Sequence, residues 1–176
     1  MTWKIDPSHS SVEFAVRHMA ISTVRGRFRS VSGTIESGDD GTLERVQATI
    51  DARSVDTGEP QRDAHLRSAD FFDAETHPFL TFRSTTVRAQ AGGRYEITGD
   101  LTIRGQTRPV TLQVETVGPL PDPWGNRRAA ATISGALNRK DFGLTYNQAL
   151  EFGGVLVGEE VRFTIDVEAV AQEQAA

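Results

Sequence analysis

The chain has 176 residues, a formal net charge of −5 and no cysteine. This length suits a single undivided domain, and the negative charge argues against a generally basic nucleic-acid-binding protein. Without cysteine there are no disulfides, no thiolate catalysis and no cysteine-ligated metal centres.

The N-terminal segment, residues 1–7, lacks a basic stretch followed by an apolar run, so no secretory signal is expected. No later stretch approaches the length of a transmembrane helix. The sequence therefore predicts a cytoplasmic protein without stable membrane insertion.

Apolar and polar residues alternate with a period of two along most of the chain, which is typical of half-buried strands. The alternating runs lie at residues 12–16, 31–35, 46–50, 81–83, 95–103, 110–114, 129–137 and 161–167. Short turns rich in glycine and aspartate separate several of them, which indicates antiparallel pairing. We expect an all-β fold, an eight-stranded antiparallel barrel, because closure removes exposed sheet edges. Residues 1–170 would form this one domain, and residues 171–176 a frayed tail.

The run at residues 129–137 has small residues on one face, namely Ala129, Ala131 and Gly135. An eight-stranded barrel is either filled by side chains or encloses one small ligand, and small inward residues favour a cavity. Glycines at Gly33, Gly99 and Gly135 are equally consistent with bends in the barrel wall. This pattern leaves both interpretations open.

Residues 59–73 are the one stretch that departs from strand alternation. Pro60 suits an early helical position, and a helix through about Ser68 is expected, with Asp63 and Arg67 spaced to pair along it. Such a charge-rich helix is commonly a solvated surface element. In an all-β chain, however, a single helix followed by Phe71 and Phe72 favours the mouth of a barrel.

Several ordered motifs resemble the YceI-like family of bacterial lipid-binding proteins. They are WKIDPSHSSVEFAVRH at residues 3–18, VRGRF at 24–28, RDAHLRSADFF at 62–72, GDLTIRG at 99–105, PVTL at 109–112 and NRKDFGL at 138–144. The resemblance implies an elongated lipocalin-like barrel with one short helix near its mouth. It also implies an interior that binds a polyisoprenoid, such as a polyprenyl phosphate, a polyprenyl pyrophosphate or an isoprenoid quinone. Fatty acids and fatty amides are the alternative ligands, and a homodimer would be consistent with the family.

With such a ligand, the apolar tail and the polar head need different residues. The predicted tail pocket comprises Phe14, Val16, Met19, Phe28, Ile50, Leu66, Phe71, Phe72, Phe79, Phe82, Leu101, Ile133 and Phe142. Each of the nine phenylalanines of the chain, taken singly, is also consistent with an ordinary core position. The predicted head-group residues are His18, Arg62, His65, Arg67, Arg139 and Lys140. Arginine suits phosphate, although Arg139 and Lys140 are also placed to pair internally with Asp141.

No catalytic residue, metal site or cofactor is predicted, apart from the bound lipid itself. The four histidines form no metal-ligand pair at helical spacing, and no nucleophile elbow or glycine-rich phosphate loop is present. The favoured function is carriage, storage or sequestration of the lipid. The alternatives are an enzyme acting on such a lipid, with His65 or His18 as acid/base and Asp63 as orienting residue, and a structural stress protein whose cavity is incidental.

Overall fold

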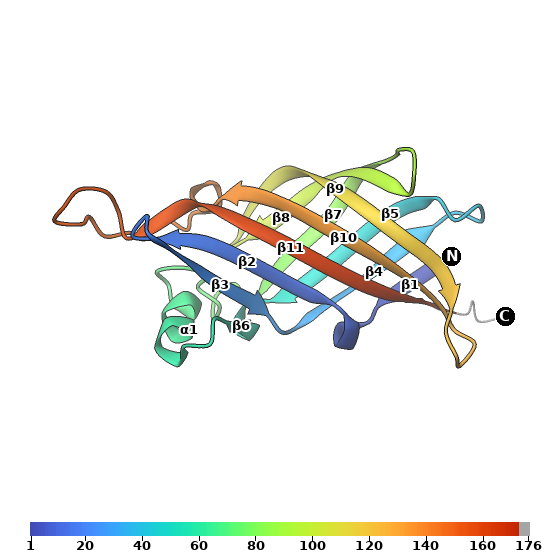
Figure 1. The fold of residues 1–176 in the computed structure, drawn as a ribbon, viewed down its shortest axis with the longest axis horizontal. Helices are drawn as coiled ribbons and strands as arrows, with labels where there is room; N and C mark the ends of the chain where they lie inside the picture. Colours follow the sequence, from blue (N-terminus) through green and yellow to red (C-terminus); the bar gives the residue numbers. More distant parts are fainter. Residues whose placement is uncertain (173–176) are drawn as a thin grey trace.

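The structure is a computed structural model that describes residues 1–172. It is an elongated antiparallel barrel with both termini at one end and the α-helix near the other (Figure 1). The strands are β1 (Thr2–Ile5), β2 (Ser11–His18), β3 (Ser22–Phe28), β4 (Val31–Ser37), β5 (Leu43–Asp51), β6 (Val55–Asp56), β7 (Phe79–Ala89), β8 (Arg94–Ile103), β9 (Gln106–Pro121), β10 (Arg127–Asn138) and β11 (Val157–Ala171). The helix α1 spans Pro60–Arg67, and three 3₁₀ turns are η1 (Pro7–His9), η2 (Ala52–Ser54) and η3 (Arg139–Phe142).

The sheet closes because β11 pairs with β10 on one side and with both β1 and β2 on the other. β1 and β2 act as one long strand interrupted by η1, and β4 and β3 run antiparallel to them in the same way. Around the ring follow β5, β7, β8, β9 and β10. The predicted eight-stranded antiparallel, lipocalin-like barrel is therefore confirmed.

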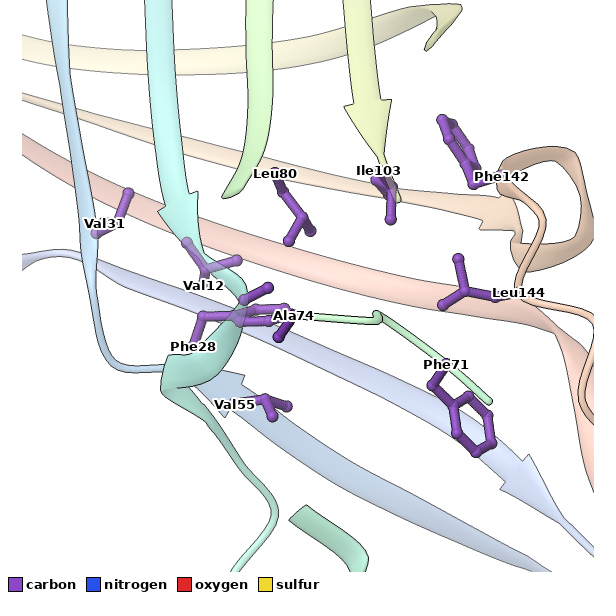
Figure 2. Close-up of a cluster of buried hydrophobic side chains, with 11 residues drawn as sticks. Val12, Phe28, Val31, Val55, Phe71, Ala74, Leu80, Ile103, Phe142 and Leu144 are labelled. Atoms are coloured by element: carbon purple, nitrogen blue, oxygen red, sulfur yellow. The ribbon is translucent and has the colours of Figure 1, made fainter. Parts of the chain in front are cut away.

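Two clusters of apolar side chains form the interior. One lies towards the α1 end and gathers Val12, Phe28, Val31, Val55, Phe71, Ala74, Leu80, Ile103, Phe142 and Leu144 from strands and loops (Figure 2). The other is centred on Ile97, Val114 and Ile133, which β8, β9 and β10 direct inward. Neither is a solid plug, since most of their members line the cavity described below.

The interior glycines answer the question that the sequence left open. A Cβ at Gly99 would lie 2.5 Å from the Arg83 carbonyl oxygen, opposite a β-bulge between Ser84 and Thr86. A Cβ at Gly135 would lie 2.7 Å from the Phe163 ring. These two glycines thus serve a bend and close packing, whereas Ala129 and Ala131 line the cavity.

The helix α1 begins and ends as its sequence predicts. The Glu59 side chain accepts hydrogen bonds from the backbone N–H groups of Gln61 and Arg62, and Pro60 follows it at the first helical position. The predicted pair between Asp63 and Arg67 is wrong, because Asp63 is buried and Oδ1 accepts from the backbone N–H and the hydroxyl of Thr57 at 2.8 and 2.6 Å. This contact ties the helix to the chain that enters it.

The segment of residues 57–78, which contains α1, covers one side of the barrel. In residues 1–172, β3 has a partner on its outer edge only at Arg27 and Phe28, where β6 pairs with it. A Cβ at Gly26 would lie 2.8 Å from Thr57 Cγ2, so the start of this segment contacts β3 directly. The helix therefore lies where the strand ladder is incomplete (Figure 1).

The prediction that a frayed tail begins at residue 171 is wrong, because the ordered strand extends further. Ala171 is the last residue of β11, and the Gln172 N–H donates to the Thr2 carbonyl at 2.8 Å. Residues 173–176 lie outside the described residues. Within residues 1–172, no helix has both the length and the apolar character needed to cross a membrane.

A charged network on the wall, at the end that holds the termini, joins β10 and β11 to the β1–η1 and β9–β10 connections. Arg128 of β10 donates to Asp122 at 2.9 Å, to Asp6 at 2.9 Å and to Glu168 of β11 at 2.5 Å. Hydrogen bonds from Ser8, His9 and Arg128 hold the pKa of Asp6 well below its usual range. Hydrogen bonds from Asn126 and Arg128 lower the pKa of Asp122 in the same way, and the carboxylates raise that of Arg128.

This network predicts a loss of stability in acid. A carboxyl with a lowered folded-state pKa contributes its full stability above the unfolded-state pKa of about 4, and that stability is lost as the pH falls further. We expect Arg128→Met to lower the unfolding free energy at pH 7 and to flatten its decline below about pH 4. Urea unfolding between pH 7 and pH 3 measures both effects.

Arg88→Met is the matched control, because Arg88 makes an exposed cross-strand pair with Glu96 at 3.4 Å, and such pairs contribute little. Identical pH profiles for Arg128→Met and the wild type would contradict the assignment.

Candidate functional site

A cavity of about 780 Å³ occupies the barrel, which is within the range of small-molecule sites. Its walls are mainly aliphatic and aromatic side chains directed inward by the strands. At the α1 end its lining includes Arg17, His18, Arg62 and Tyr146, and at the opposite end it includes Gly38, Asp39, Asp40 and Gly41 of the β4–β5 turn. The cavity therefore extends along the barrel from one end to the other.

Eleven of the thirteen predicted tail-pocket residues line this cavity. They are Phe14, Val16, Phe28, Ile50, Leu66, Phe71, Phe72, Phe82, Leu101, Ile133 and Phe142. Their contact with a ligand stays a prediction, but the structure brings them together around one space.

Met19 and Phe79 do not line the cavity, because the backbone points them elsewhere. Met19 is exposed at the β2–β3 turn. Phe79 begins β7 on the outward face, with Leu80 next to it facing inward, and its ring lies 6.0 Å from the Arg53 guanidinium carbon. The prediction that Met19 and Phe79 belong to the tail pocket is therefore wrong, because both are surface residues.

Four of the six predicted head-group residues line the cavity, namely His18, Arg62, His65 and Arg139. Arg67 and Lys140 are not among the lining residues. Lys140 Nζ lies 2.5 Å from Glu159 Oε1, in a half-exposed ion pair outside the cavity. The predicted basic residues that line the cavity therefore come from β2, α1 and η3.

Arg62 is held at the rim by the residue that also binds Asp63. Its Nε donates to Thr57 Oγ1 at 2.8 Å and its Nη2 to the Thr57 carbonyl at 3.1 Å. Nη1 has no acceptor among residues 1–172, so it is the one guanidinium nitrogen without a partner in this part of the chain.

His65 lies in an aromatic group that sequence reasoning did not find. Its ring packs edge-on against Phe71, with centroids 5.0 Å apart, and against Tyr146, at 4.8 Å. Its Nε2 lies 2.7 Å from Asp70 Oδ2. The predicted orienting role of Asp63 is wrong, because Asp70 pairs with His65 while Asp63 is bonded to Thr57.

Arg139 is a buried cation, 4% exposed, on the cavity wall. Its guanidinium donates to the backbone carbonyls of Leu144, Val157 and Gly158 at 2.6, 3.3 and 2.8 Å. Burial lowers the pKa of Arg139, and the charge of Glu159 opposes this effect. The guanidinium therefore joins both ends of the 143–156 loop, besides adding positive charge to the cavity wall.

Two further arginines shape this end of the cavity, and sequence reasoning missed both. Arg17 lines the cavity and donates from Nη2 to the Ala20 carbonyl at 2.8 Å. Arg104 donates to the carbonyls of Phe71 and Gly143, each at 3.2 Å, and so connects the 57–78 segment to the loop after η3. The charged side chains of Arg17 and Arg104 therefore hold loops in place at this end of the barrel.

One group of possible metal ligands occurs in residues 1–172, and it lies away from the cavity. Asp6, His9 and Glu168 bring ligand atoms within 4.8 Å of one another. Arg128 Nη1 already donates to both carboxylates, so a cation stands between them. We assign this cluster to the wall network described above.

Comparison with known proteins agrees with this architecture. The YceI-like domain model matches residues 3–169. The protein YceI of Escherichia coli O157:H7 is 38% identical over 174 residues, covering 97% of this chain and 87% of the relative.

Two solved structures have the same fold. The Campylobacter jejuni YCEI protein superposes with a TM-score of 0.77 at 28% identity, covering 89% of this chain and 90% of the other. A polyisoprenoid binding domain from Saccharophagus degradans has a TM-score of 0.72 at 17% identity, covering 97% and 98%, and so shares the fold alone. From the domain match and the curated relative, the chain belongs to the YceI-like family.

Proposed function

We propose that the protein binds a polyisoprenoid inside its barrel and acts without chemistry, as a carrier, storage or sequestration protein. The observation that carries this proposal is the apolar cavity that extends along the barrel with charged groups at its ends. The likeness to a polyisoprenoid binding domain supports the same ligand class. A long unbranched or methyl-branched chain fits an elongated space better than a compact metabolite does.

The tail would supply most of the affinity. Burying about 300 Å² of apolar ligand surface is favourable by on the order of 8 kcal/mol, at about 25 cal/mol per Å². Part of this is offset by the lost freedom of the ligand and of the side chains that it orders. Specificity must then come from the few polar groups at the rim.

The polar head would lie at the α1 end. Arg62 has a free Nη1 there, with His18 and Arg17 also on the lining, and these donors suit a phosphate. The edge-packed rings of His65, Phe71 and Tyr146 would instead suit a flat quinone ring. The two heads make different demands on Arg62, which an experiment can separate.

Blocking the cavity should strongly reduce lipid uptake. Ala131 faces inward on β10 and Ala136 is exposed further along the same strand. We expect wild-type protein to yield a long-chain lipid on solvent extraction and mass spectrometry, or to take up added polyprenyl phosphate. Ala131→Phe should lose at least about tenfold in uptake, since it fills space that the tail needs.

The control is Ala136→Phe, which adds the same ring outside the cavity and should bind as the wild type does. Thermal unfolding checks that both variants are folded. Equal uptake by the two variants would contradict a tail site in the barrel, as would a wild type that neither carries nor takes up any such lipid.

Removing the charge of Arg62 should weaken a phosphorylated ligand selectively. A hydrogen bond to a charged group is worth about 1.5–3 kcal/mol, so Arg62→Gln should weaken polyprenyl phosphate by roughly 10- to 100-fold. The same variant should bind the uncharged polyprenol almost as the wild type does. Competition against a fluorescent long-chain probe measures both affinities.

Arg67→Gln is the matched control, because Arg67 is on the same helix but does not line the cavity. An equal loss for phosphate and polyprenol would show that Arg62 acts through the helix rather than on the head. If fatty acids displace the fluorescent probe at lower concentrations than either isoprenoid does, the ligand is a fatty acid and not a polyisoprenoid. If the protein turns over the lipid and His65→Ala abolishes that turnover, the protein is an enzyme.

A further inference from the structure

Two hairpin tips project together at the α1 end of the barrel. One is the β2–β3 turn at residues 19–21, and the other lies within residues 149–155, closed by a bridge between Ala149 and Val155. The Met19 N–H donates to the Leu156 carbonyl at 2.8 Å, so the two hairpins are joined at their bases. Figure 1 shows the 143–156 loop extending beyond the barrel, at the end opposite the termini.

Both tips present apolar side chains to solvent. Phe152 is 99% exposed and Ile21 is 77% exposed, and Met19 and Val155 are also exposed beside them. We call Met19, Ile21, Phe152 and Val155 the apolar tip. Single exposed apolar residues are ordinary, but a group on adjoining loops marks an interaction surface.

The backbone conformation at Met19 and Ala20 is one that favours glycine or asparagine. Met19 and Ala20 have φ of 53° and 57°, the left-handed region that asparagine and glycine adopt most readily in two-residue hairpins. In the second tip, Gly153 and Gly154 take up the positive φ angles, 88° and 87°, and leave Phe152 at the apex. Local turn preference therefore does not account for the apolar side chain at Met19.

The apolar tip is continuous with the cavity. His18 and Leu156 line the cavity, and the next residues along the chain, Met19 and Val155, belong to the tip. The tip therefore adjoins the rim of the cavity at this end.

The size and charge of the tip indicate what it contacts. A stable protein interface buries about 800 Å² on each partner and uses about 20–30 residues a side, far more than four side chains on two narrow turns. Glu151 is the one charged residue within 19–21 and 149–155, so the tip itself offers no cationic side chain to an anionic surface. Narrow apolar loops of this kind suit insertion among lipid chains.

We propose that the apolar tip inserts into a lipid bilayer and sets the cavity mouth against the membrane, so that the ligand passes between bilayer and barrel without crossing water. The proposal rests on the function proposed above, because it supplies the route by which a membrane lipid reaches the cavity. The hydrophobic effect drives the insertion, which makes it insensitive to salt and independent of anionic lipid.

Flotation with phosphatidylcholine vesicles tests the insertion. We expect wild-type protein to float with the vesicles equally at 0.1 M and about 1 M NaCl. The double variant Ile21→Ser with Phe152→Ser should bind vesicles at least tenfold more weakly. The matched control is Leu120→Ser with Trp124→Ser, which removes two exposed apolar residues from the β9–β10 hairpin at the opposite end and should leave flotation unchanged.

The outcomes separate this proposal from the proposed function. Both double variants should take up polyprenyl phosphate from detergent micelles as the wild type does, and thermal unfolding should show them folded. If the wild type takes up the lipid but does not float, or if the control variant is the one that loses flotation, the tip proposal is overturned alone. Failure of uptake by the wild type overturns the proposed function.

Flotation that disappears in salt would also overturn the tip proposal, because electrostatics would then drive binding. A second copy of the chain is the other partner that the tip could contact, and size-exclusion chromatography tests it. If the wild type self-associates but does not float, and the tip variant is monomeric, the tip is a contact between copies of the chain.

Discussion

Closure of the strand ladder by β11 is the constraint on which the rest of the structure depends. β11 reaches β2 over its first two thirds and β1 at its end, so one strand joins both halves of the interrupted first strand. Closure pairs the backbone groups that an open sheet would expose. It also fixes the diameter of an eight-stranded ring, and the small side chains of β10 then leave space that the clusters around Phe28 and Ile133 do not fill. The cavity follows from closure and small inward residues together.

At the α1 end, most ionisable residues make hydrogen bonds that hold the fold together, and few of their polar atoms remain for a ligand. Asp63 is bonded to Thr57, Arg139 donates to three carbonyls, and Arg104 connects two loops. Buried polar groups need such partners, because leaving one unsatisfied costs more than a hydrogen bond gains. What remains for recognition is small: one nitrogen of Arg62, the rings around His65 and the neighbouring His18. The charge-dense helix segment is therefore more than a solvated surface helix: its ionisable groups hold it against the barrel and leave a limited polar rim.

The parts of the fold that the sequence reveals are those where local pattern and tertiary structure agree. Period-two alternation identified the long strands, and Pro60 with its preceding Glu59 marked the helix. β3 was not predicted, because its inward position Gly26 has no side chain and so interrupts the apolar alternation. A Cβ at Gly26 would lie 2.4 Å from the Phe14 ring. Asp63 pairs with Thr57 rather than Arg67, which no spacing rule indicates. Phe79 and Leu80 are adjacent and both apolar, so only the observed register decides which one faces the cavity. Arg17, near the end of β2, and Tyr146, in the loop after η3, also line the cavity, and neither position belongs to an apolar face that alternation indicates.

The polar rim and the apolar tip lie at the same end of the barrel, and this arrangement has a physical logic. An amphiphile in a bilayer keeps its head at the interface and its tail among the lipid chains. A tip that reaches the chains brings the cavity mouth close to the tail, while Arg62 and His65 at the mouth would remain near the level of the head. The tail can then exchange one apolar environment for another, and the head never has to enter hydrocarbon, where a charge is costly. A rim at the opposite end would require the head to travel the length of the apolar barrel. Under the two proposals together, the position of α1 beside the 143–156 loop is what makes exchange with a membrane energetically feasible.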